Sequence, residues 1–379
     1  MTSRSGWVCA PDSFKGTIDA VSAAQSLAAG LHPLKVTQIP MADGGEGTAA
    51  AIRVSCGGRW IVRSLISSQR EDSHQIGRWL SLGNRNAVVE FAEGAGLSTV
   101  GGADSLNPTS RSSFPVGQLL ASAVDSGAQM VSLGLGGSGT IDGGAGILQA
   151  LGGRFRARNR LLTEPITAED LLDIQSVDLE PVHQRLKGVE LLLAADVGNP
   201  LLGQNGAIFQ YGSQKGVLPE SEAQCEAGLE RLSQILGDPG LHPGDGSAGG
   251  AGFGLRVGAG GTLISGATYV GSLVGLDHAC AQAEWVVTGE GQYDQQTRQG
   301  KVPWHVAQCA KASGAQVALV CGRINGDQLE EAKQTFDLCV ELSSLCPSHG
   351  VSDSTETVLH TAGEWLRRQT GSASSDVRK

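Results

Sequence analysis

Five glycine-rich segments of the chain each carry a carboxylate or a lysine, side chains that can bind metal ions or phosphates. Asp and Gly together are typical of a surface turn, but glycine also lets the backbone approach a charged ligand closely. Any one segment fits both interpretations. The segments are PDSFKG (11–16), PMADGGEG (40–47), GGSGTIDGGAG (136–146), DVGNP (196–200) and TGEGQYD (288–294).

The five segments share a position, because each lies at the end of a short apolar run. Seven such runs predict buried parallel strands, and helix-like stretches at 17–31, 115–128 and 142–153 lie between them. This alternation predicts an α/β fold with a mostly parallel, doubly wound sheet. The runs are Trp7–Ala10, Val36–Ile39, Ala87–Phe91, Val131–Leu135, Leu191–Ala195, Trp285–Thr288 and Val317–Cys321.

Ligands of open α/β sheets bind at the carboxyl ends of the strands, where these segments lie. Several acids at one sheet edge would repel one another unless a cation lay among them. Glycine-rich loops that open helices offer free N–H groups to phosphate oxygens. Acids for Mg²⁺, amides for phosphate and a lysine for charge are the parts of a phosphoryl-transfer site.

Composition narrows the class of protein. A chain of 379 residues is long for one core and predicts two domains. The formal net charge of −10 argues against a nucleic-acid partner. No apolar run is long enough for a membrane span, and no secretory signal is recognised, so we expect a cytoplasmic protein. The cysteines have no C-x-x-C spacing and are expected to be free thiols.

One alternative remains open at this stage, a dinucleotide-dependent oxidoreductase. GLGGSG matches G-x-G-x-x-G through Gly134, Gly136 and Gly139, after a strand and before a helix. A dinucleotide-binding site has an acidic residue about 20 positions after this glycine motif, which binds the ribose. The chain has the basic RFRARNR (154–160) there, so only an NADP version fits. It leaves the acids of the other segments without a role.

The segments together resemble the type I glycerate kinases, the ATP-dependent glycerate 2-kinases. The resemblance runs from residue 10 to about 303 in the order and spacing of that family. The matching stretches are APDSFKGT (10–17), PMADGGEGT (40–48), LGGSGTIDGGAGILQALGG (135–153), AADVGNPLLGQNGAIFQYGSQKG (194–216) and VVTGEGQYDQQTRQGKVP (286–303).

The resemblance implies transfer of the ATP γ-phosphoryl group, with Mg²⁺, to D-glycerate, giving mainly 2-phosphoglycerate. It also implies two α/β domains, one inserted into the other, with the active site in the cleft between them. We expect an outer Rossmann-like domain at 1–60 plus 285–379 and an inserted domain at 61–284. The sequence does not choose between the 2- and 3-phospho products, nor does it reveal the oligomeric state.

The resemblance and the strand-end positions together suggest catalytic roles. Asp196 is expected to orient or deprotonate the acceptor hydroxyl. Lys15 would neutralise the transferring phosphoryl group or the glycerate carboxylate, and Lys215 in GSQKG is a weaker candidate for a similar role. Gly136, Gly137, Ser138, Asp142 and Lys215 are the expected nucleotide-binding residues, with Asp142 either near a helix start or on a substrate hydroxyl.

The metal side of the site is expected to use Asp43, Glu290 and Asp294. Asp43 also counts among the catalytic candidates, because it would face the metal–phosphate centre. Glu46, three residues later, would share a helical face with Asp43 or cap the following helix.

The chain departs from the family pattern near the expected acceptor. Ile141 stands where the family has an asparagine, and SSFPVGQ (112–118) stands where it has TSxGTGE. LISSQREDSHQIGRWLSLG (65–83) also lacks the usual TGPLG turn. These differences leave a related hydroxy acid as a possible acceptor. A second alternative is a catalytically silent sensor that binds glycerate or a nucleotide.

Overall fold

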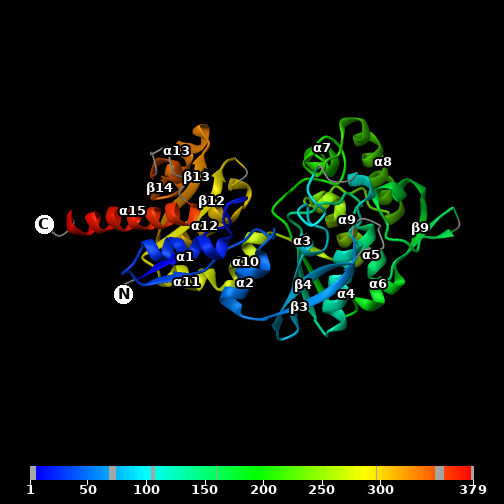
Figure 1. Ribbon diagram of the computed structural model, residues 1–379, viewed down its shortest axis with the longest axis horizontal. Helices are drawn as coiled ribbons and strands as arrows, with labels where there is room; N and C mark the ends of the chain where they lie inside the picture. Colours follow the sequence, from blue (N-terminus) through cyan, green and yellow to red (C-terminus); the bar gives the residue numbers. More distant parts are fainter. Residues whose placement is uncertain are drawn as a thin grey trace. The chain divides into compact units, whose positions relative to one another are not determined.

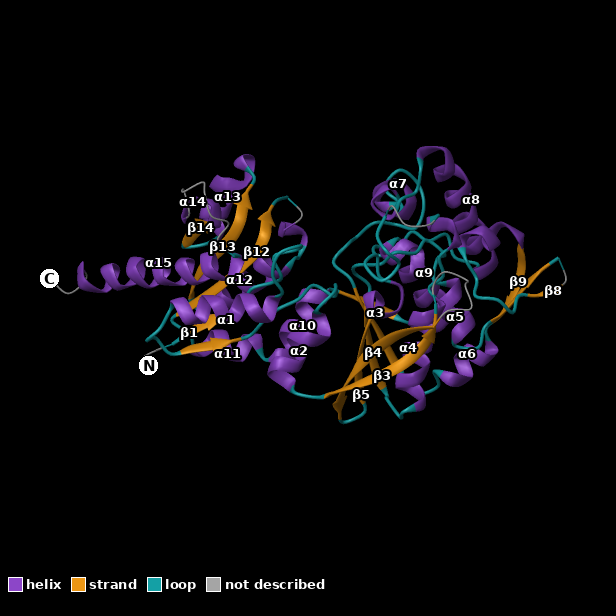
Figure 2. Ribbon diagram, in the orientation of Figure 1, coloured by secondary structure: helices purple, strands orange, loops and turns teal. Residues whose placement is uncertain are grey.

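The chain forms two compact α/β units in the computed structural model, each with its own sheet (Figures 1 and 2). The predicted α/β class with mostly parallel strands is confirmed. Unit 1 comprises Met1–Asp43, Ala50–Gly57 and Gly266–Lys379, and unit 2 comprises Gly44–Ala49 and Gly58–Ser265. The structure describes residues 6–67, 74–103, 107–158, 160–295, 297–345 and 354–376.

The sheet of unit 1 has five parallel strands in the order β14-β13-β12-β1-β2. Numbered along the unit, this is the 2-1-3-4-5 order of doubly wound flavodoxin-like folds. The order reverses between β1 and β12, and ligands bind such sheets beyond the carboxyl ends of these two strands. The strands are β1 (Trp7–Cys9), β2 (Val36–Gln38), β12 (Trp285–Tyr293), β13 (Gln316–Ile324) and β14 (Leu338–Glu341).

Helices cover both faces of this sheet. On one face α1 and α15 lie side by side (Figure 1), and a Cβ atom on Gly30 would lie only 2.0 Å from the carbonyl oxygen of His360. Leu27 of α1 and Leu366 of α15 belong to one buried hydrophobic cluster with Val287 of β12. Helix α12 packs against β12 and β13. The helices are α1 (Ala20–Gly30), α10 (Gly266–Val274), α11 (Leu276–Gln282), α12 (Val302–Ser313), α13 (Leu329–Thr335), α14 (Leu342–Leu345) and α15 (Thr355–Asp376).

The sheet of unit 2 has six strands in the order β11-β10-β6-β5-β4-β3. Four of them are parallel, whereas β4 and β3 extend the sheet as an antiparallel hairpin. A separate three-stranded antiparallel sheet follows α5. The strands are β3 (Arg59–Ile66), β4 (His74–Gly83), β5 (Asn86–Glu90), β6 (Met130–Gly134), β10 (Glu190–Ala194) and β11 (Thr262–Ile264), with β7 (Arg154–Ala157), β8 (Arg160–Leu161) and β9 (Ile174–Asp178) in the small sheet.

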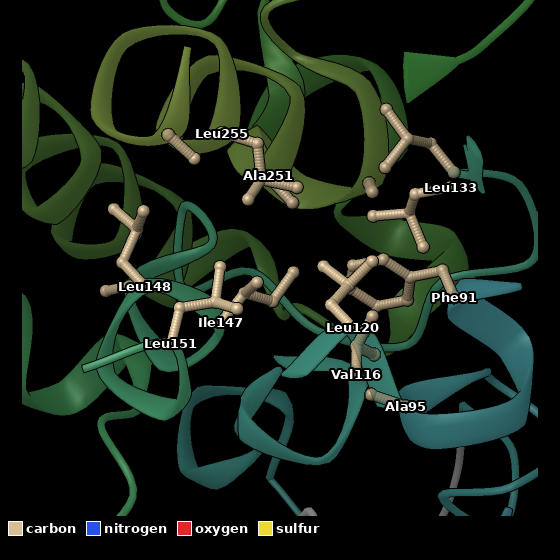
Figure 3. Close-up of a cluster of buried hydrophobic side chains, with 14 of the residues drawn as sticks. Phe91, Ala95, Val116, Leu120, Leu133, Ile147, Leu148, Leu151, Ala251 and Leu255 are labelled. Carbon is tan, nitrogen blue, oxygen red and sulfur yellow. The ribbon is translucent and has the colours of Figure 1, made fainter. Parts of the chain in front are cut away.

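The core of unit 2 lies between its main sheet and several helices. Figure 3 shows Leu120 of α4, Ile147 of α5 and Ala251 of α9 near Phe91 and Leu133. Helix α2 begins in unit 2 and ends in unit 1. The helices are α2 (Thr48–Cys56), α3 (Phe91–Ala95), α4 (Phe114–Asp125), α5 (Ala145–Ala150), α6 (Glu180–Arg185), α7 (Ala207–Tyr211), α8 (Pro219–Leu236) and α9 (Ser247–Ala259).

All seven predicted strands are confirmed, with ends that shift by a few residues. The small sheet corrects the oxidoreductase alternative, because Arg154–Ala157 forms β7 in that sheet and not a strand beside β6. The basic run therefore does not lie where a dinucleotide ribose would be held. Within the described residues, no helix is long and apolar enough to cross a membrane. Seven cysteines are free, as expected, and Cys346 lies outside the described residues.

Candidate functional site

Unit 1 contains an acidic pocket at the point where its strand order reverses. The pocket has a volume of about 490 Å³ and is lined by Asp12, Asp43, Glu290 and Asp294. Asp12 follows β1, whereas Glu290 and Asp294 belong to the end of β12 and the loop after it. The structure thus brings together the three side chains expected on the metal side. It adds Asp12 of the PDSFKG segment, for which the sequence had predicted no role.

Burial and repulsion by neighbouring acids raise the pKa of two of these carboxylates, Asp12 and Glu290. Burial raises the pKa of Asp12 well above its ordinary value, and the negative charges of Asp43 and Glu290 raise it further. Burial likewise raises the pKa of Glu290 to about 7, although the hydroxyl of Thr297 donates a 2.7 Å hydrogen bond to its Oε1. A cation in the pocket would relieve this repulsion and stabilise the ionised forms.

Two lysines supply positive charge at the rim of the acidic pocket. The Nζ of Lys15 lies 3.9 Å from Oδ2 of Asp43, and the Nζ of Lys301 lies 3.9 Å from Oδ1 of Asp294. The side chain of Lys15 is 79% exposed, so its amine can turn toward a ligand. Lys301, which directly precedes α12, was not among the predicted residues, although it stands in the recognised stretch QGKVP.

The acidic pocket fits Mg²⁺ by its chemistry, since all its acidic ligands are hard oxygen donors. Among the described residues, no group of three or more His, Cys, Asp or Glu side chains is already arranged around a metal position. Kinase Mg²⁺ sites need only one or two carboxylates, because substrate phosphates and water complete the octahedron. The assignment of Asp43, Glu290 and Asp294 to a metal therefore stays a prediction.

In unit 2, the glycines of PMADGGEG let one loop cross the ends of two strands. Gly44 has φ +89°, and a Cβ atom there would lie 2.6 Å from the carbonyl oxygen of Ala194 at the end of β10. A Cβ atom on Gly134, at the end of β6, would lie 2.5 Å from the carbonyl oxygen of Gly44. The amide of Gly136 donates to that same oxygen at 3.1 Å. These glycines are needed for backbone contact between strand-end loops.

Glu90 holds the same loop from the end of β5. Its carboxylate accepts hydrogen bonds from the amides of Gly47 and Ala49, at the start of α2. Burial raises the pKa of Glu90 to about 7, and the two amides partly oppose this rise. Glu90 thus occupies the helix-start role that was one of the two alternatives for Glu46, while Glu46 is exposed. Sequence reasoning missed Glu90, whose signal was an acid within the apolar run Ala87–Phe91.

The loop after β6 is held by a buried lysine. The Nζ of Lys215 donates to Oγ of Ser138 at 2.8 Å and to the carbonyl oxygen of Thr140 at 2.9 Å. Burial lowers the pKa of Lys215 to about 7, and Arg111 lowers it further, whereas Asp142 opposes the shift. Three predicted nucleotide-binding residues therefore lie together: Ser138, Asp142 and Lys215.

Arg111, which sequence reasoning missed, is fully buried behind this loop. Its guanidinium donates to the carbonyl oxygens of Gly139, Lys215 and Gly102. It thus ties the loop after β6 to the short helical turn that carries Lys215. Arg111 directly precedes the 112–118 segment, which departs from the family pattern. Its position beside that departure was the sequence signal that could have identified it.

Asp142 is enclosed in the fold, where it holds the starts of two helices. Its Oδ2 accepts from the amide and hydroxyl of Ser113, at 2.8 and 2.7 Å, just before α4. Its two oxygens also accept from the amides of Gly144 and Gly146, at the start of α5. This is the helix-start position that was one of its two expected roles. Contact with a ligand stays a prediction.

The departures from the family pattern have structural places in unit 2. Ile141 is fully buried and belongs to the hydrophobic core, so the missing asparagine is replaced by apolar packing. Ser113 of the changed 112–118 segment is the partner of Asp142. Part of the third departure, residues 68–73, lies outside the described residues.

Asp196 follows β10 and is half-buried. The hydroxyl of Ser265, which follows the neighbouring strand β11, donates to its Oδ1 at 3.2 Å. Two adjacent parallel strands thus place a carboxylate and a hydroxyl side by side at the carboxyl edge of the sheet. This arrangement orients the carboxylate, as a residue that positions a substrate hydroxyl requires.

Comparisons with known proteins identify the family of the chain. Residues 7–373 match the model of the glycerate kinase family. A glycerate kinase of Halalkalibacterium halodurans is 36% identical over 329 residues, covering 84% of this chain and 85% of that protein. A glycerate 2-kinase of Escherichia coli K12 is 32% identical over 335 residues, covering 84% of this chain and 86% of that protein.

The crystal structure of a proposed glycerate kinase 2 from Salmonella typhimurium LT2 matches with a TM-score of 0.83 at 28% identity, covering 98% of this chain and 100% of that one. The chain therefore belongs to the glycerate kinase family.

Proposed function

We propose that this protein is a glycerate kinase that transfers the γ-phosphoryl group of ATP to D-glycerate and forms 2-phosphoglycerate. Membership of the glycerate kinase family over residues 7–373 is the observation that carries the proposal. The name of the Escherichia coli relative, a glycerate 2-kinase, supports the 2-phospho product. ATP follows from the kinase class, while Mg²⁺ and a cytoplasmic location are parts of the proposal.

The acidic pocket of unit 1 is proposed to bind Mg²⁺ and the phosphates that accompany it. Asp43, Glu290 and Asp294 would hold the ion, which when bound neutralises charge on the phosphate oxygens. Lys15 is proposed to neutralise the transferring phosphoryl group or the acceptor carboxylate. Its high exposure supports this role, since an exposed lysine contributes little to stability and is free to move.

The glycine-rich loop of unit 2 is proposed to bind an anionic group of a substrate. The backbone of Gly136 and Gly137, the hydroxyl of Ser138 and the amine of Lys215 would be its donors. Lys215 has two neutral acceptors, so an anion would complete its third hydrogen bond and stabilise its charged form. Asp196, oriented by Ser265, is proposed to orient or deprotonate the acceptor hydroxyl.

The proposal is tested by incubating the purified chain with D-glycerate, ATP and MgCl₂ and following the products by ³¹P NMR. ADP and 2-phosphoglycerate are expected, and EDTA should abolish both. 3-Phosphoglycerate would overturn the assigned product alone. Binding of glycerate or ATP without turnover would instead indicate a sensor. A D-glycerate-dependent change in nicotinamide absorbance without ADP would indicate an oxidoreductase.

A further inference from the structure

An arginine-lined pocket lies in unit 2 beside the start of β5. The catalytic candidates of unit 2 follow the carboxyl ends of β6 and β10, whereas this pocket includes Asn86, the first residue of β5, and Ala128, just before β6. Its volume is about 480 Å³, which is within the range of small-molecule sites. Arg59, Arg63 and Arg85 line it, and no acidic side chain does.

The register of β3 and β4 places two of the arginines on one face of the sheet. Arg59 pairs with Ser81 and Ile61 pairs with Trp79, and because side chains alternate, Arg59, Ile61 and Arg63 share this face. Helix α4 packs against the same two strands (Figure 1). Its Ser122 Oγ accepts from Nε1 of Trp79 at 3.1 Å and from Nε of Arg63 at 2.8 Å.

The third arginine is held by a turn in an unfavourable backbone conformation. Asn84 and Arg85 form the two-residue connection between β4 and β5, with φ values of 46° and 62°. Such turns favour Asn followed by Gly, because both positions need positive φ. The carbonyl oxygen of Arg85 accepts from the amides of Gln129 and Met130, which fixes the turn. An arginine thus occupies a position where glycine would be less strained.

The positive charge of the pocket is not neutralised within the part of the chain that the structure describes. No ion pair reaches Arg59, Arg63 or Arg85 there, although the whole chain has a net charge of −10. Asp125, in the last turn of α4, pairs with Arg185 at 3.3 Å. Three guanidinium groups around one pocket therefore have no counter-charge from these residues.

The arginines are not needed to cap the end of α4. The amides of Ser126, Gly127 and Ala128 already donate to the carbonyl oxygens of Ser122, Val124 and Ala123, at 3.1, 2.9 and 3.2 Å. A structural role at the helix terminus would require arginine N–H groups on these carbonyls. Arg63 donates instead to Oγ of Ser122 and to the carbonyl oxygen of its neighbour Val62.

We propose that this pocket binds a small polyanion, a molecule that carries two or more carboxylate or phosphate groups. Planar guanidinium groups pair with either group through parallel hydrogen bonds, and three of them match more than one negative charge. The pocket volume suits one small molecule, and the net negative charge of the chain disfavours a polymeric anion. Helix α4, 12 residues and about 18 Å long, separates the pocket from Ser113 and Asp142, so this site is distinct from the catalytic candidates.

The test is isothermal titration calorimetry of the full chain at low salt, without Mg²⁺, with citrate and pyrophosphate as probes. Wild type is compared with the double variant Arg59→Gln/Arg85→Gln. We expect at least one probe to bind wild type and to bind the variant at least about tenfold more weakly, because charged hydrogen bonds are lost. The probe that shows this loss identifies the group, carboxylate or phosphate, that the pocket prefers.

The matched control is Arg156→Gln/Arg160→Gln, which removes two exposed arginines from the small sheet. Its affinity should stay within about twofold of wild type, because only the overall charge changes. Two results would overturn the proposal: no binding of either probe by wild type, or the same weakening in the control as in the pocket variant.

A single variant separates binding from folding. Arg85→Gly removes one guanidinium and relieves the strain of a left-handed residue with a side chain, so its melting temperature should be unchanged or higher. Its affinity for the preferred probe should nevertheless fall several-fold. Wild-type affinity in Arg85→Gly would remove Arg85 from the site. Because none of these measurements involves turnover, their outcome is independent of the kinase assay.

Discussion

At the carboxyl ends of the unit 1 strands, Asp12, Asp43, Glu290 and Asp294 line an open pocket. At the corresponding ends in unit 2, Glu90 and Asp142 instead bind the amides of the protein's own loops. Both regions combine glycines with acids in the sequence, yet the acids of one line a pocket and those of the other hold backbone. An acid in a glycine-rich loop is therefore not by itself a sign of ligand binding.

The largest effect that this difference predicts is on stability. Asp142→Ala should lower the free energy of unfolding by about 3 kcal/mol or more, because it leaves four buried donors without their acceptor. Asp43→Asn should leave stability unchanged or higher, because the charge of Asp43 repels that of Asp12. Urea denaturation followed by circular dichroism measures both. Equal losses in the two variants would contradict the comparison.

Asp196 should behave as a catalytic group, although it belongs to unit 2. Asp196→Asn is expected to lower turnover at least about 100-fold with an unchanged melting temperature, because the amide cannot accept the acceptor's proton. The steady-state kinase assay and a thermal melt measure these values. Ser265→Ala, which removes only the orienting hydrogen bond, should cost less. Near wild-type turnover in Asp196→Asn would remove Asp196 from the mechanism.

Substitution of Lys15 tests whether the acidic pocket binds a ligand. Lys15→Ala should reduce turnover by about 100-fold, as expected for loss of a charge that acts in the transition state. The melting temperature should change little, since this side chain is 79% exposed. Kinetics and calorimetry on the same preparation separate the two effects. Unfolding of the variant would give Lys15 a structural role instead.

The pH dependence of kcat/KM should depend on one titrating group from each unit, Glu290 and Lys215. It is the smallest of the expected effects. Below pH 7 Glu290, whose pKa is raised to about 7, becomes protonated and binds a cation less well. Above pH 7 Lys215, whose pKa is lowered to about 7, loses the charge that would bind an anion. A bell-shaped profile with a maximum near pH 7 is expected, each limb falling by up to about tenfold per unit.

Lys215→Arg is the control for the alkaline limb, because arginine keeps its charge at these pH values. Its profile should lose the fall above pH 7 while the acid limb remains, even if the maximal rate is lower. Glu290→Gln should remove the acid limb instead and raise the Mg²⁺ concentration needed for half-maximal rate. An alkaline limb that persists in Lys215→Arg would assign it to another group.

Much of the fold could be predicted from short-range pattern. Continuous apolar runs such as Val131–Leu135 are buried on both faces of a sheet, and this alone identifies them. The small sheet of β7, β8 and β9 was missed, because its strands are short and lie in a polar stretch. The alternation in β3, where Arg59 and Arg63 face the same side as Ile61, was also overlooked.

The candidate site was predictable where a carboxylate stands within a few residues after a strand, as Asp43 and Asp196 do. It was not predictable where the role depends on a distant partner. Glu90 acts on amides 41 and 43 residues away, and Lys215 acts on the loop at Ser138, 77 residues away. No local pattern records which backbone amide a buried acid will meet.

The sequence by itself determined the order of features along the chain, in which apolar runs are followed by glycine-rich loops that carry acids or a lysine. It also carried the resemblance that named the family. These features depend on neighbours within about ten residues, so periodicity and turn chemistry reveal them. Only the tertiary structure decided which charged side chains line a pocket and which ones hold backbone. The burial, hydrogen-bond partners and pKa of a side chain depend on contacts between residues far apart in the chain. The tertiary structure was therefore needed to show that Asp43 lines a pocket, whereas Asp142 accepts hydrogen bonds from backbone amides.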